Sequence, residues 1–108
     1  MKIIRNSIIP FKGFKAINIC GILFARKEAK ISGITINHEE IHTAQMKEMW
    51  YLFFYIQYLI EFFLRLLVMR GVKDAYRNIS FEQEAYDNEI DMSYLKTRKR
   101  FNWRSYFN

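Results

Sequence analysis

The hydrophobic pattern divides the chain into an N-terminal part with the features of β-strands and a longer part with the features of helices. Residues 2–9 and 16–24 are rich in Ile, and residues 30–36 alternate between apolar and polar side chains. These patterns predict strands within residues 1–36, most simply short antiparallel strands or a meander. Residues 10–13 contain a Pro and a Gly, so a turn is expected there.

The pattern beyond residue 36 predicts helices. Asn37 is a good N-cap residue, and Glu40 follows three positions later, which completes a variant of the capping box. A helix is therefore expected to begin at this point. The chain has no further Gly or Pro until Gly71, where a helix end is expected.

Another helix start is predicted near residue 80, after a connector over residues 72–79. Ser80 and Gln83 have the spacing of a capping box, and the helix that they open is expected to run to about Leu95. Short strands followed by about three helices place the chain in the α+β class.

Length and composition indicate one globular domain. The chain has 108 residues, of which 51% are hydrophobic and 18% aromatic, and this excludes a disordered chain. The single cysteine, Cys20, rules out an internal disulfide and lies in an apolar stretch, so we expect a buried, unreactive thiol. The first residues lack the unbroken apolar run of a signal peptide, and a cytoplasmic protein is expected.

The charge distribution bears on possible partners. The formal net charge is +6, and residues 96–107 combine cations with aromatic side chains. Such a mixture suits an anionic membrane surface, an acidic partner or nucleic acid, and it is equally compatible with a solvated tail that packs a few rings. No nucleic-acid-binding motif is present, so no specific nucleic acid is expected as a partner.

One segment, residues 50–69, is apolar over nearly the length that spans a bilayer. However, Gln57, Glu61 and Arg65 recur every four residues and share one helix face, and Glu61 and Arg65 are spaced for an ion pair. Charges near the middle of a lipid-spanning helix are rare. We therefore favour a buried helix or one that lies on the membrane surface, which allows a peripheral or, as the lesser alternative, an integral location at the inner membrane.

The segment His38-Glu39-Glu40-Ile41-His42 carries the clearest chemical signal. In a helix, residues four apart project on the same face, so the two histidines can bind one ion, and zinc accepts neutral imidazole nitrogens. Glu39 points about 100° away and is free to take a proton from a metal-bound water. The chain has only two histidines, and both lie in this H-E-x-x-H motif.

With this motif the chain resembles the gluzincin type of zinc metallopeptidase, in particular its minimal, single-domain members. The resemblance covers Thr35 to Ala44 and Phe81 to Asn88. It implies a minimal zincin-like fold, a bound zinc ion, and a third ligand supplied by a Glu of a second helix. The segment Glu82-Gln-Glu-Ala-Tyr86 is similar to the Glu-x-x-Ala-Asp segment of membrane-linked gluzincins, so Glu82 is the implied ligand. Glu84 is the alternative.

Two departures from the gluzincin pattern matter. Glu40 is charged where the middle positions of the motif are normally uncharged, and Tyr86 stands in place of the Asp that usually orients a zinc-bound histidine. Asp87, Asn88 or Glu61 could orient the histidine in place of that Asp. The related metzincin pattern does not fit, because this chain has Gln45 and Glu48 where that pattern requires Gly and His.

The zinc hypothesis requires that the chain bends after the histidines. One straight helix over residues 38–70 would be about 50 Å long, and Glu82 would then lie out of reach of His38. We therefore predict a break between about Gln45 and Tyr55, although no Gly or Pro marks it. Gln45 lies on the same face as His38 and is expected to pack there, to line the cleft or to bond the strands.

These observations predict a small zinc metallopeptidase that acts on a peptide or protein substrate. The candidates for the hydrogen-bond donor to the oxyanion are Tyr76, Arg77 and Tyr86. The alternative is a metal-stabilised binding or membrane-surface module without turnover, and the oligomeric state is not predicted. The predicted organisation is a single domain over residues 1–108, with strands (1–36), the active-site helix and the apolar helix (37–70), the third-ligand helix (80–96) and a basic, aromatic tail (97–108).

Overall fold

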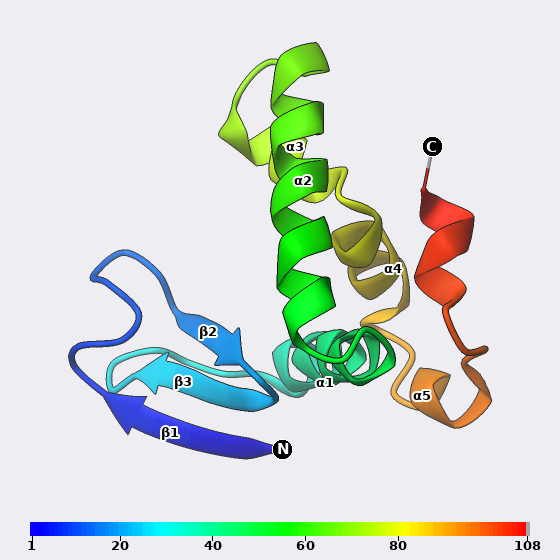
Figure 1. Ribbon diagram of the computed structural model, residues 1–108. Coiled ribbons are helices and arrows are strands. Elements are labelled where there is room, and N and C mark those ends of the chain that lie inside the picture. The colour runs from blue at the N-terminus through cyan, green and yellow to red at the C-terminus, as the bar shows by residue number, and fades with distance from the viewer. Residues whose placement is uncertain (108) are drawn as a thin grey trace.

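The computed structural model describes residues 1–107 and has an α+β fold, which confirms the predicted class (Figure 1). A small sheet comes first and helices follow. The elements are β1 (Lys2–Asn6), β2 (Ala16–Ile19), β3 (Ile22–Arg26), α1 (Gly33–Glu48), α2 (Leu52–Val68), α3 (Val72–Arg77), α4 (Ser80–Asn88), α5 (Tyr94–Thr97) and the 3-10 helix η1 (Asn102–Tyr106).

The sheet is mixed, whereas the sequence analysis favoured antiparallel strands. Its strand order is β1-β3-β2, with β1 parallel to β3 and β2 antiparallel to β3. The predicted single strand over residues 16–24 is instead a hairpin, because Cys20 and Gly21 have φ angles of 51° and 91°. Such positive φ values are typical of two-residue hairpin turns. Cys20 is exposed at this turn, so the prediction of a buried thiol is wrong.

Helix α1 begins earlier than predicted, and residues 30–36 do not form a strand. The N-cap is Ser32, whose hydroxyl accepts a hydrogen bond from the backbone amide of Thr35 at 3.2 Å. Asn37 therefore lies inside the helix. Its side-chain amide donates to the backbone carbonyls of Glu89 and Asp91, which ties the end of α4 to the start of α1.

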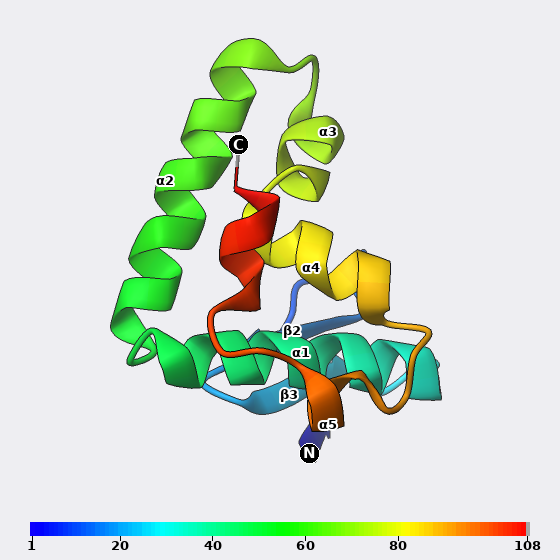
Figure 2. The ribbon, with the colours of Figure 1, turned by 90° about the vertical axis from the view of Figure 1, so that its right-hand side faces the viewer.

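The predicted break after α1 is confirmed. Helix α1 ends at Glu48, α2 begins at Leu52, and the two helices meet at a bend of 111° (Figure 2). Trp50 and Tyr51 make the bend with φ angles of 55° and 57°. These are left-handed values that neither residue adopts readily, so the residue types at the break do not reveal its position.

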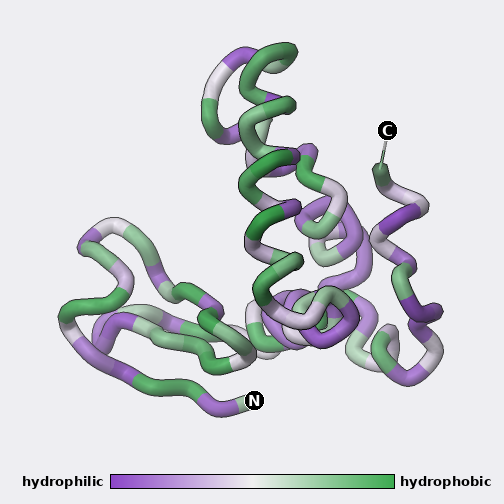
Figure 3. Tube along the Cα trace, viewed as in Figure 1, coloured by the Kyte–Doolittle hydropathy of each residue, from purple (hydrophilic) through white to green (hydrophobic). Residues whose placement is uncertain are grey.

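Helix α2 is not buried, which contradicts one of the two arrangements that we favoured: only Phe54 and Glu61 of its residues are buried. Its side chains are nonetheless mostly apolar (Figure 3). Within residues 1–107 no single helix has the length and hydropathy to cross a bilayer, and α1 and α2 meet that test only as a bent pair.

The start of α4 also differs from the prediction. The capping box of Ser80 and Gln83 does not form, since the Ser80 hydroxyl donates to Glu61 and the Gln83 amide donates to the Asn78 carbonyl. The predicted connector before this point contains α3, and α4 ends at Asn88 rather than near Leu95.

The apolar core lies where α1, α2, α4 and η1 meet. Its buried residues are Met46, Phe54, Ile79, Phe81 and Trp103. Because Trp103 belongs to the predicted tail, part of that tail packs into the protein. The core thus joins α4 to α1 and holds the two helices that carry the predicted metal ligands (Figure 2).

Candidate metal centre

The structure brings His38, His42 and Glu82 together between α1 and α4. The Nε2 atoms of the two histidines are 3.1 Å apart, and they lie 3.2 and 3.1 Å from Oε1 of Glu82. All three residues are buried. They form a group of ligand atoms that is compatible with one metal ion.

The spacing of these three atoms matches the face of a coordination tetrahedron. Two ligands bound to one zinc ion at 2.0–2.1 Å, with a tetrahedral angle between them, would lie about 3.3–3.4 Å apart. The observed triangle has nearly equal sides of 3.1–3.2 Å. The three ligand atoms would therefore have to move apart only slightly to accommodate the ion.

Gln45 orients the His42 ring. The Gln45 amide nitrogen donates to the Phe81 carbonyl at 3.0 Å and to Glu84 at 2.9 Å, and both partners only accept hydrogen bonds. The Gln45 oxygen must therefore face His42, whose Nδ1 lies 2.8 Å away and donates to it. The neutral ring then has its lone pair on Nε2, the atom that faces Glu82, as a metal ligand requires.

Glu89 occupies the equivalent position beside His38. Its Oε1 atom lies 3.5 Å from Nδ1 of His38, which favours a proton on Nδ1 and a free lone pair on Nε2. The ring of Tyr86 packs edge-on against the His38 ring, with centroids 4.5 Å apart. Tyr86 thus packs against a histidine, while the carboxylate contact comes from Glu89.

Helix α2 positions the carboxylate of Glu82. The Tyr58 hydroxyl donates to Oε2 of Glu82 at 2.6 Å, so that Oε1 is left for the histidines. Glu61, one turn further along α2, accepts hydrogen bonds from the backbone amide and the hydroxyl of Ser80, each at 2.8 Å. Ser80 is the first residue of α4, where unpaired amides and the helix dipole favour an anion.

The electrostatics of the cluster favour a positive charge at its centre. Burial works to lower the pKa of His42, but the charge and the hydrogen bond of Glu82 outweigh it and raise this pKa to about 9. Burial likewise works to raise the pKa of Glu82, yet His42 and hydrogen bonds from His38 and Tyr58 lower it. The cluster therefore stabilises a positive charge between the histidines and Glu82, which a proton on His42 carries when no metal ion is bound.

Glu39 lies beside this cluster and is half-buried. Its negative charge contributes to raising the pKa values of His42 and Tyr58, so the carboxylate faces the same region. Within residues 1–107 this carboxylate accepts no hydrogen bond, although the backbone carbonyl of Glu39 accepts from Asn18 and Thr43. A carboxylate that is near the cluster and unpaired is available to exchange protons with a water there.

Glu84, the alternative third ligand, lies in a different network. It is fully buried, and its carboxylate accepts hydrogen bonds from Gln45, Tyr94 and Arg98. Arg98 also forms two hydrogen bonds with Glu48. This network holds the C-terminal segment against α1 and α4, and Glu84 does not join the histidines.

The three residues considered as oxyanion donors lie together next to the cluster. The hydroxyls of Tyr76 and Tyr86 are 3.4 Å apart, and the guanidinium of Arg77 stacks over the Tyr86 ring at 3.7 Å. Burial raises the pKa of Tyr76, and the charge of Glu82 raises it further. Tyr76 therefore keeps its proton and remains a hydrogen-bond donor near the third ligand.

Glu89 and Tyr58 were not predicted as residues of the site, and the role of Gln45 was left open. Helical spacing could have identified two of them, since Gln45 follows His38 by seven residues and Glu89 follows Glu82 by seven, and such residues share one face. Nothing in the sequence indicated Tyr58, because its role depends on the angle between α2 and α4. The other suggested partners, Asp87, Asn88 and Glu61, do not contact a histidine among the described residues.

Comparisons with known proteins identify no relative of this chain. No protein-family model matches the chain, and no curated protein and no solved structure matches it. The functional argument therefore depends on the motif and on the geometry of the cluster.

Proposed function

We propose that this chain is a small zinc metallopeptidase of the gluzincin type. The observation that carries the proposal is the triangle of His38, His42 and Glu82 ligand atoms with the unpaired carboxylate of Glu39 beside it. Three protein ligands leave a fourth position for water, which is the arrangement typical of catalytic zinc sites. Among the described residues, no other His, Cys, Asp or Glu belongs to the ligand group.

The donor set favours zinc. Two imidazole nitrogens and one carboxylate oxygen form the ligand set found in many zinc hydrolases. Calcium and magnesium prefer six or more oxygen ligands, and two nitrogens are a poor match for either. Bound zinc would supply a water with a lowered pKa and would polarise a carbonyl group.

The chain's own residues would perform the remaining steps. Glu39 would accept the proton of the attacking water and deliver it to the leaving amine. The Tyr76 hydroxyl, which lies near Glu82, would donate a hydrogen bond to the oxyanion. Gln45 and Glu89 would keep both imidazoles in the tautomer that binds the metal.

The test compares Glu39→Gln with Glu40→Gln in a zinc-loaded protein. Glu40 is the matched control, because it neighbours Glu39 but lines a separate cavity with Cys20 and Thr43. Hydrolysis of a mixed peptide library is followed by mass spectrometry, and zinc by elemental analysis. We expect Glu39→Gln to keep its zinc and to lose about 10²-fold or more of its turnover. Equal turnover in both variants would contradict the assignment.

A second candidate is a structural metal site without turnover. It is favoured by burial, since His38, His42 and Glu82 are 6%, 5% and 3% exposed. Substitution with cobalt(II) distinguishes the two candidates. A visible spectrum that changes when acetohydroxamate is added indicates an open coordination position and supports catalysis. A spectrum that does not change indicates a closed site and supports the structural role.

A further inference from the structure

Every exposed side chain of α2 is apolar. Nine residues form this surface, which we call the apolar face, and each is between 45% and 82% exposed. On an ideal helix they occupy about half of the circumference. The residues are Leu52, Phe53, Ile56, Leu59, Ile60, Phe63, Leu64, Leu67 and Val68.

Three polar side chains of α2, those of Gln57, Tyr58 and Glu61, face the protein instead. Gln57 donates to Glu61, Glu61 accepts from Ser80, and Tyr58 donates to Glu82. A surface helix of a water-soluble protein has the opposite arrangement, with its polar side outward. Polar groups toward the protein and apolar groups outward are typical of a helix in contact with lipid.

The apolar face is also large. At about 150 Å² for a large apolar side chain, its exposed part is on the order of 800 Å². The largest apolar patch on a typical soluble monomer covers roughly 300–600 Å². An apolar surface of this size is unfavourable in water, so we expect a partner to cover it.

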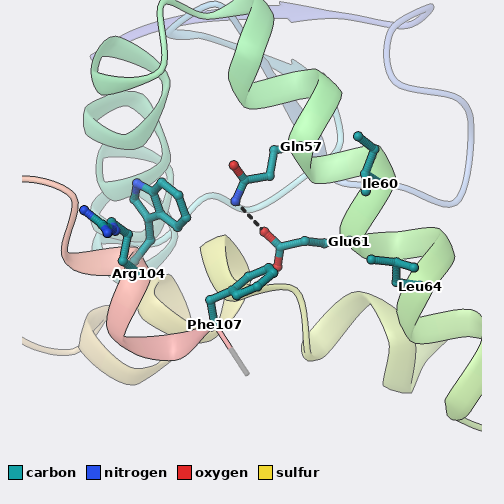
Figure 4. Close-up of a pocket in the computed structure, with 7 residues that line it drawn as sticks. Gln57, Ile60, Glu61, Leu64, Arg104 and Phe107 are labelled. Atoms are coloured by element: carbon teal, nitrogen blue, oxygen red, sulfur yellow. Dashed lines mark hydrogen bonds between the residues drawn. The ribbon is translucent and has the colours of Figure 1, made fainter.

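Cations border the apolar face. Arg70 and Lys73 are exposed just beyond the C-terminal end of α2. Along the side of the helix, Ile60 and Leu64 line a cavity of about 440 Å³ whose opposite wall includes Arg104 (Figure 4). Arg104 is exposed as well. Apolar side chains flanked by exposed cations are complementary to a bilayer with anionic headgroups.

We propose that the apolar face of α2 docks on an anionic lipid bilayer, with Arg70, Lys73 and Arg104 against the headgroups. A second copy of the chain fits less well, for two reasons. One partner helix covers a narrow seam, whereas the apolar face takes up half of the helix. Pairing would also bring together the like charges of two chains that each carry a formal net charge of +6. The proposal is independent of the metal chemistry.

The experiment is flotation of the full-length chain with vesicles of phosphatidylcholine alone or with 3:1 phosphatidylcholine and phosphatidylglycerol. Leu59→Asp and Phe63→Asp test the apolar face, and both side chains are more than half exposed, so the fold depends little on them. Ile90→Asp is the matched control, because Ile90 is 76% exposed and lies outside α2. Sedimentation without lipid measures the oligomeric state.

We expect flotation with the anionic vesicles, a loss of roughly tenfold or more in Leu59→Asp and Phe63→Asp, and no loss in Ile90→Asp. Arg104→Ser should weaken binding by about fivefold, and only to vesicles that contain phosphatidylglycerol. Two results would overturn the proposal: no flotation, or equal flotation of all variants. A lipid-free dimer that Leu59→Asp dissociates, together with absent flotation, would assign the apolar face to a second copy of the chain.

Discussion

The carboxylate of Glu61 accepts hydrogen bonds from both the backbone amide and the hydroxyl of Ser80, each at a distance of 2.8 Å. This contact fixes the first residue of α4 to the inner face of α2. Glu82 follows two residues later and receives the Tyr58 hydroxyl from the same face. The inner side of α2 thus determines where the third ligand of the candidate metal centre lies.

Replacing Glu61 with Leu should destabilise the protein. The Ser80 amide and hydroxyl are buried and would lose their acceptor, which should lower the free energy of unfolding by about 2–4 kcal/mol. Urea denaturation followed by circular dichroism measures the change. Arg65→Leu is the control on the same helix face, and it should change the unfolding free energy by less than about 1 kcal/mol. Equal losses in the two variants would show that Glu61 has no special role.

Replacing Gln45 with Leu should weaken metal binding. The variant keeps the approximate size of the side chain but removes the acceptor that holds the proton on Nδ1 of His42. Zinc affinity, measured by competition with a chelator, should fall about 10- to 100-fold. Gln57→Leu, which changes the glutamine that bonds Glu61, serves as the control and should retain most of its affinity. The tautomer argument fails if the two variants bind zinc equally well.

Glu84→Gln should affect stability rather than metal content. Its carboxylate accepts hydrogen bonds from Arg98 and Tyr94 in a buried site, and the neutral amide would leave the guanidinium less well paired. The free energy of unfolding should fall by about 1–3 kcal/mol. Glu28→Gln removes a carboxylate that pairs with Arg26 at the surface and should leave the free energy of unfolding almost unchanged. A Glu84→Gln protein as stable as Glu28→Gln would contradict this account of the network.

The bend between α1 and α2 is predicted to carry strain at Trp50. This residue is 81% exposed and has a φ angle of 55°, a region that Asn occupies more readily than Trp. Trp50→Asn should therefore raise the free energy of unfolding by about 0.5–1 kcal/mol. Leu52→Asn, at an exposed helical position, should lower it by a few tenths of a kcal/mol. Urea denaturation of both variants without lipid tests the difference, and a decrease in Trp50→Asn would contradict the prediction.

The α+β class and the gathering of His38, His42 and Glu82 could be predicted from the sequence, for different reasons. Helical spacing fixes the relation between the two histidines, because it follows from local geometry. The break after α1 could be predicted because Glu82 has to lie within reach of the two histidines. No residue type marks that break, since Trp50 and Tyr51 adopt left-handed angles only because the surrounding packing requires them.

The errors came from local signals that tertiary contacts overrode. Asn37 is a good N-cap residue, yet its amide is used to hold the end of α4. Ser80 had the pattern of a capping box, but Glu61 from another helix supplies the acceptor. The apolar segment over residues 50–69 suggested burial, whereas most of the apolar side chains of α2 are exposed and the charged Glu61 is buried. Composition alone does not reveal which side of a helix faces inward.

The most direct test of the metal centre is the zinc content of the purified chain after zinc loading and dialysis. We predict one zinc ion per wild-type chain and essentially none in Glu82→Ala, with Glu84→Gln equal to wild type. A wild-type protein without zinc, or a Glu82→Ala protein that retains a full equivalent, would contradict the assignment of these three residues as the metal site.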